Sequence, residues 1–186
     1  MSKAATLVSF CADLKARLPT SRDSAALDAL GADLATHIRA AEAQSQKAHP
    51  GAKKRAPDLD RGGTELWNLC TRLRRDLGGP GEELHGAARS REKLLARCRY
   101  FAFLLIDVAR RSVGELCGRD VVHLARLALK VGKSCVGCGE LAVSLGALQR
   151  AAELIEGIKG KDVDGDVEGE VMKLEVEHFI LRTVQV

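Results

Sequence analysis

Residues 63–76 read GTELWNLCTRLRRD, a stretch that combines a helical pattern with the only tryptophan of the chain, Trp67. Thr64 is placed to cap a helix after the turn formed by Gly62 and Gly63. We therefore predict an amphipathic helix that docks on the rest of the protein, with Trp67 as a packing anchor rather than a ligand contact. The apolar side chains that share one helical face are Leu66, Leu69, Cys70, Leu73 and Leu77.

The composition of the whole chain also favours helices. Aromatic residues make up only 3% of the 186 residues, whereas strands favour aromatic and β-branched residues. Apolar residues at 46%, charged residues at 29% and only four prolines are typical of a globular rather than a disordered chain. The net charge of +4 allows an acidic partner but is too small for a nucleic-acid-binding arm.

The sequence predicts an intracellular protein that does not span a membrane. The first helix-like stretch carries Asp13, Lys15 and Arg17 within its apolar pattern, unlike a secretory signal. The longest apolar run, 100–106, is far shorter than the ~20 residues that a bilayer requires. Without a secretory route, the cysteines are expected to be reduced thiols. These are Cys11, Cys70, Cys98, Cys117, Cys135 and Cys138.

Apolar periodicity and helix-breaking residues predict seven helices and no strand. The second helix is expected to begin at Ser21 or Ser24, the fourth to be capped by Ser90, and the fifth by Asp120. A glycine-rich acidic loop is expected at 159–170. The predicted helices cover approximately 3–18, 21–47, 64–77, 90–111, 120–136, 140–157 and 167–183.

Two prolines, a glycine and three adjacent cations between His49 and Pro57 predict an extended, solvated linker. This linker divides the chain into three segments. They are an N-terminal helical segment at 1–47, a basic linker rich in proline and glycine at 48–62, and a helical-repeat segment at 63–186.

The fifth and sixth predicted helices fit one tetratricopeptide-like unit, in which two antiparallel helices cross closely over ~34 residues. Ala128 replaces the usual aromatic residue, and Glu156 stands where a helix-ending proline is common. The pattern predicts an all-α fold of antiparallel helix pairs, stacked as a tetratricopeptide-like solenoid fragment. The positions that match the repeat are Gly132 beside Val131 in the first helix, and Ser144, Leu148 and Ala151 in the second.

One alternative function is a thiol or zinc protein built on Cys135 and Cys138. The pair follows a helix, whereas a thioredoxin-like site needs the motif at a helix N-terminus. A structural zinc site would need a second ligand pair, which the sequence lacks. Packing at a helix end is therefore favoured.

A second alternative is a small basic helical module that binds nucleic acid through Lys53–Arg55 and through Arg72, Arg74 and Arg75. Lys53–Arg55 also resembles a nuclear import signal. No aromatic residues interleave with these cations to stack on bases, so charged surface is the favoured interpretation.

Two further acidic features are interpreted as structural. Asp162–Glu168 resembles a calcium-binding loop, but its glycine is in the fourth place, whereas such a loop requires glycine in the sixth. Lys173 stands in the twelfth place, where a bidentate glutamate is required. Asp107 lies within an apolar helix and has no recognisable catalytic partner. It is expected to make a buried polar contact between helices.

Three blocks of the chain carry a family resemblance. They are Gly63–Asn68 with Arg72–Arg74, then Phe101–Asp107, then Ala128–Lys130 with Lys133–Cys135 and Arg150–Glu153. In this order and spacing they resemble the N-terminal region of the meiosis-specific, sporulation-type scaffolds of the ZMM crossover group, most closely the fungal members. The resemblance covers roughly residues 60–183, and His178–Arg182 resembles the start of that family's next repeat.

The resemblance implies a tetratricopeptide-like solenoid in the nucleus, on meiotic chromosomes. It implies binding to other crossover and chromosome-axis proteins in support of synapsis and crossover formation, without catalytic residues, cofactor or metal. The family continues for many repeats beyond this point, so the chain is expected to be a truncated gene model or a short paralogue. An open solenoid end exposes apolar surface, which predicts self-association or instability.

Overall fold

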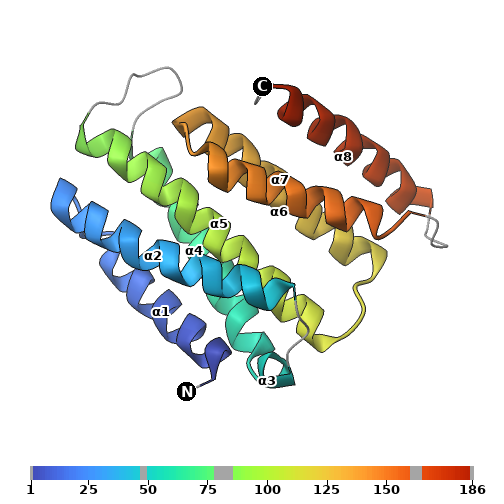
Figure 1. Cartoon of the computed structure of the whole chain (residues 1–186), viewed down its shortest axis with the longest axis horizontal. Helices are drawn as coiled ribbons and strands as arrows, with labels where there is room; N and C mark the ends of the chain where they lie inside the picture. Colours follow the sequence, from blue (N-terminus) through green and yellow to red (C-terminus); the bar gives the residue numbers. More distant parts are fainter. Residues whose placement is uncertain (1, 47–49, 78–85, 160–164, 185–186) are drawn as a thin grey trace. The chain divides into compact units, whose positions relative to one another are not determined.

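The computed structural model describes residues 2–46, 50–77, 86–159 and 165–184, and in these ranges every regular element is a helix. The predicted all-α fold class is therefore confirmed (Figure 1). The chain divides into two compact units, Met1–Gly114 and Glu115–Val186. The helices are α1 (Lys3–Arg17), α2 (Ser24–Ser45), α3 (Pro50–Lys53), α4 (Ala56–Arg75), α5 (Ala87–Val113), α6 (Gly118–Cys138), α7 (Leu141–Glu156) and α8 (Gly165–Val184).

The Met1–Gly114 unit contains two antiparallel helix pairs. In the first pair, the Phe10 ring of α1 stacks on His37 of α2 with ring centroids 3.6 Å apart. In the second pair, Arg74 near the end of α4 forms an ion pair with Glu92 near the start of α5, at 3.4 Å. Each pair therefore folds back on itself as a helical hairpin.

The two hairpins stack with like helices together. Helix α1 runs parallel to α4, because Cys11 donates a hydrogen bond to the Gly62 carbonyl and, further along both helices, Lys15 pairs with Glu65. Helix α2 runs parallel to α5 in the same way, and Tyr100 of α5 donates to Glu42 of α2 at 2.9 Å. The first helix of one hairpin thus packs on the first helix of the other, and the second helix packs on the second. This is the packing expected of stacked helical repeats.

Helix α5 lies at the centre of this unit, with α2, α3 and α4 packed against it. All residues from Tyr100 to Ala109 are buried, so this part of α5 exposes no face to solvent. A helix that is apolar nearly all round requires neighbours on several sides. The second half of α5, which contains the apolar run 100–106, has these neighbours.

The predicted linker at 48–62 is wrong for the residues that the structure describes. Residues 50–53 form α3, and α4 begins at Ala56, eight residues earlier than predicted. Pro57 occupies the first turn of α4, where a missing N–H costs no helical hydrogen bond. Ala56 and Leu59 are buried and extend the apolar face of α4. The division into two units follows Gly114 rather than this segment.

Several predicted helix starts also differ from the structure. Thr64 is not a cap but an exposed residue within α4. Asp23 caps α2, its carboxylate accepting from the Ala26 amide at 2.8 Å. Helix α5 begins after Gly86 rather than at Ser90, and α6 begins at Gly118. Short polar residues occur near every start, so the sequence alone does not single out the cap.

The Glu115–Val186 unit is built on the antiparallel pair α6 and α7. Ser144 of α7 donates to the Gly132 carbonyl of α6 at 3.0 Å. A Cβ added to Gly132 would lie 2.8 Å from Leu148 Cδ2, so the helices cross where only glycine fits without adjustment. Ala151 is fully buried nearby. The small positions predicted for a tetratricopeptide-like crossing are thus confirmed.

Candidate functional site

Helix α8 packs on α6 and α7 through one face. Its side chains Val167, Val171 and Leu174 are buried. The His178 ring lies 3.1 Å from the Leu148 carbonyl of α7, and Lys159, which follows α7, pairs with Glu175 at 2.8 Å. These contacts make α8 antiparallel to α7 and leave its opposite face without a neighbour in its unit (Figure 1).

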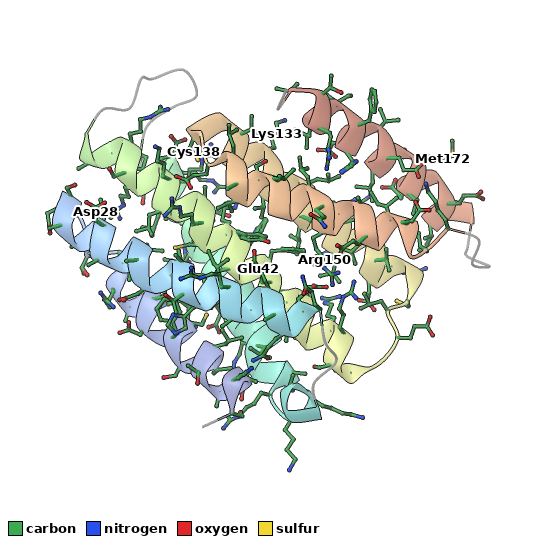
Figure 2. All side chains as sticks on the ribbon, viewed as in Figure 1. Asp28, Glu42, Lys133, Cys138, Arg150 and Met172 are labelled. Carbon is green, nitrogen blue, oxygen red and sulfur yellow. The ribbon has the colours of Figure 1, made fainter. Side chains whose placement is uncertain are left out.

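The opposite face of α8 is also apolar, and we call it the α8 outer face. Its members recur at a spacing of three and four residues, which aligns them along one side of a helix. Met172 points away from α6 and α7 (Figure 2). The α8 outer face consists of Met172, Val176, Phe179, Ile180 and Val184, whose exposed fractions are 62%, 61%, 70%, 54% and 66%.

The sequence pattern predicts α8 but does not distinguish its buried apolar face from its exposed apolar face. Along the sequence of α8, the buried residues Val171 and Leu174 alternate with members of the outer face such as Val176 and Phe179. The helix also begins at Gly165, within the predicted loop. A helix with two apolar stripes on opposite sides requires a second neighbour to remove the outer stripe from water.

Charged residues line both edges of the α8 outer face. Lys173 and Glu177 are exposed along one edge. Glu168 and Arg182 are exposed along the other edge, with the half-buried Glu175 between them. An apolar stripe with a charged rim has the anatomy of a protein-binding surface rather than of a small-molecule site.

Asp107 makes the predicted polar contact between helices. The carboxylate is fully buried and accepts from Ser45 of α2 at 2.5 Å. It also accepts from Arg111 of its own helix at 2.9 Å. These contacts join α2 to the centre of the unit.

Trp67 is half-buried on α4, beneath a residue of α5. The Arg99 guanidinium lies 4.4 Å from the centroid of the indole ring, within the range of a cation–π contact. This contact occupies a face of the ring and agrees with the predicted role of Trp67 in packing.

The structure does not bring the two basic clusters together. Lys53 and Lys54 are exposed just before α4, whereas Arg72 and Arg75 are exposed at its end, roughly 27 Å further along the helix axis. Within the clusters, Arg55 pairs with Asp58 at 3.1 Å, and Arg74 pairs with Glu92. Neither cluster extends the other into one basic surface.

Cys135 and Cys138 lie in the last turn of α6, and both are buried. The Cys138 thiol donates to the Cys135 carbonyl at 3.5 Å, a contact within the helix end. Over the described ranges, no three histidine, cysteine or acidic side chains are grouped as metal ligands. Of the calcium-like stretch, 162–164 lie outside the described residues, and Gly165–Glu168 form the first turn of α8.

A cluster of three cysteines in the Met1–Gly114 unit was missed by sequence reasoning. Cys11, Cys70 and Cys98 come from α1, α4 and α5, and all three are buried. Burial raises the pKa of Cys11 to about 11, although the Lys15 charge opposes the shift. Burial is the main cause that raises the pKa of Cys98 well above its usual value, and a hydrogen bond with Cys70 adds to this effect. The only sequence signal was that each cysteine occupies an apolar helix face.

We expect one thiol per chain to react rapidly with a disulfide reagent at about pH 8, because the reactive form is an accessible thiolate. Cys117 is the exposed cysteine, and its thiol donates to Asp120 at 3.0 Å. All six thiols should react after denaturation, and Cys117→Ser should remove the rapid phase. A rapid phase that survives in Cys117→Ser and maps to Cys135 or Cys138 would contradict the packing role of that pair.

Comparison of the chain with protein-family models, with curated proteins and with solved structures finds no match. Across the described ranges, no helix combines the length and the apolar character needed to cross a membrane.

Proposed function

We propose that the chain is a non-enzymatic protein-interaction scaffold that supports chromosome synapsis and crossover formation in meiosis. The observation that carries the binding role is α8, which buries one apolar face in its unit and exposes another. Exposed amphipathic helices are a common means of binding protein partners. The meiotic role rests on the resemblance of Gly63–Asn68, Phe101–Asp107 and the α6–α7 pair to the sporulation-type scaffolds.

The buried Asp107 carboxylate and the buried thiols support this proposal because they are engaged in packing. The Asp107 carboxylate joins α2 to α5, and the buried thiols lie between helices. Neither set is assigned a catalytic or ligand-binding role. The proposed partners are other crossover and chromosome-axis proteins, and the proposed location is the nucleus, on meiotic chromosomes.

The nucleic-acid alternative is not favoured by the arrangement of charges. Direct binding to a phosphate backbone needs several cations on one surface, and its affinity falls steeply with salt. The two clusters of this chain lie at opposite ends of α4, and Arg55 and Arg74 already pair with carboxylates. A protein partner is therefore the better candidate.

A tagged chain expressed from its own locus is expected to form foci on meiotic chromosomes. Deletion of the gene is expected to reduce both synapsis and crossover number. The measurement combines imaging of chromosome spreads with genetic mapping of crossovers in the source organism. Normal synapsis and crossover number after deletion, with the tagged chain absent from meiotic chromosomes, would contradict the proposal.

A further inference from the structure

We propose that the α8 outer face binds the same face of a second copy of the chain, with the two α8 helices antiparallel about a two-fold axis. This inference rests on the proposed interaction function, because it names an occupant of the same surface. Most homo-oligomers of soluble proteins are two-fold symmetric, and each copy then contributes the same patch to the interface.

The apolar residues of α8 are compatible with this symmetry. A two-fold axis beside Val176 places that side chain against its own copy. It places Met172 against Ile180 of the second copy, because each lies one turn from Val176 in opposite directions. Phe179 then lies beside Met172 of the second copy. Met172, Val176, Phe179 and Ile180, four side chains that are each more than half exposed, would leave water in this way.

The charged residues along the two edges of the α8 outer face favour the antiparallel orientation of the two α8 helices. In an antiparallel two-fold pair, each edge of α8 meets the same edge of the second copy. On one edge, Lys173 then opposes Glu177 of the second copy, and the reverse contact also forms. On the other edge, Glu168 opposes Arg182 of the second copy. Opposite charges at the rim of an interface fix its register.

Glu175 is the exception on the second edge, because it lies near the axis and approaches its own copy. Its carboxylate already pairs with Lys159 at 2.8 Å, which reduces the repulsion. A parallel pair would bring unlike edges together and place Glu177 beside Glu175 of the second copy. Lys173 lies equally close to that Glu175, so each opposite-charge contact of the parallel pair is offset by a like-charge contact. The antiparallel pair instead forms four opposite-charge contacts and one like-charge contact, which favours the antiparallel arrangement.

Sedimentation equilibrium of the full chain is expected to give twice the monomer mass of 20.0 kDa at roughly 100 µM. Val176→Glu should weaken dimerisation by at least about tenfold, since it places two charges at the axis. The matched control is Val113→Glu, because Val113 is 64% exposed in the other unit and Val176 is 61% exposed. This control should remain dimeric, and circular dichroism should show equal helix content in both variants.

Charge reversal tests the register. Lys173→Glu and Glu177→Lys should each weaken the dimer by about tenfold, since each creates two like-charge contacts. The double variant should restore wild-type affinity, because the pairs reform with opposite polarity. A monomeric wild-type chain would overturn the proposal, as would a dimer unaffected by Val176→Glu or not restored in the double variant. A monomer that still forms foci on meiotic chromosomes would overturn the second copy as occupant while supporting the scaffold function.

Discussion

Gly63→Ala is expected to destabilise the Met1–Gly114 unit by about 2 kcal/mol, even though alanine favours helices. An added Cβ would lie 2.8 Å from the Ala102 carbonyl oxygen and 2.8 Å from Ile106 Cγ1 of α5. Because the closest atoms include the backbone of α5 in its buried part, α4 and α5 would have to separate. Urea unfolding followed by Trp67 fluorescence measures the loss, since the only tryptophan lies in this unit.

Two glycine positions provide matched controls. A Cβ added to Gly62, the neighbouring residue, would lie 3.4 Å from the Cys11 sulfur, so Gly62→Ala should be close to neutral. At Gly132 the closest atom is the end of the Leu148 side chain, which can change rotamer. Gly132→Ala should therefore cost less than Gly63→Ala. Equal stability of Gly63→Ala and Gly62→Ala would contradict the close crossing of α4 and α5.

Asp107→Ala is expected to destabilise the same unit by about 3 kcal/mol, because it removes one partner from a buried hydrogen-bonded network and leaves a cavity. Ser45 loses its acceptor, and Arg111 loses the carboxylate 2.9 Å from its Nε. Ser45→Ala should cost only about 1 kcal/mol, since the carboxylate keeps the Arg111 contact. The same urea titration measures both variants. An Asp107→Ala variant as stable as Ser45→Ala would show that the carboxylate does not organise this part of the core.

Local periodicity was sufficient to predict most of the helices. The longest apolar run, 100–106, lies in the buried part of α5, and the α6–α7 crossing followed from the small residues Gly132, Ser144 and Ala151. Asp107 was recognisable as a buried polar contact because no other charge interrupts its apolar surroundings. These features depend on residues that lie close together in sequence.

Features that depend on tertiary packing were not predictable in this way. The segment before Gly63 has the proline, glycine and cations of a linker, but Leu59 is buried and continues the face of α4. In α8, apolar residues on opposite sides resemble one broad stripe until the position of α6 and α7 is known. The cluster of Cys11, Cys70 and Cys98 joins helices that are distant in sequence.

Crossover number in meiotic cells that express Val176→Glu or Val113→Glu in place of the wild-type chain gives the most direct test of the α8 outer face. Both variants replace an exposed valine with glutamate, at 61% and 64% exposure, so both should leave the fold intact. We expect Val176→Glu to lower synapsis and crossover number to the level of the deletion, and Val113→Glu to match the wild type. Wild-type crossover number in cells with a stably expressed Val176→Glu chain would contradict the assignment of this face as the interaction surface.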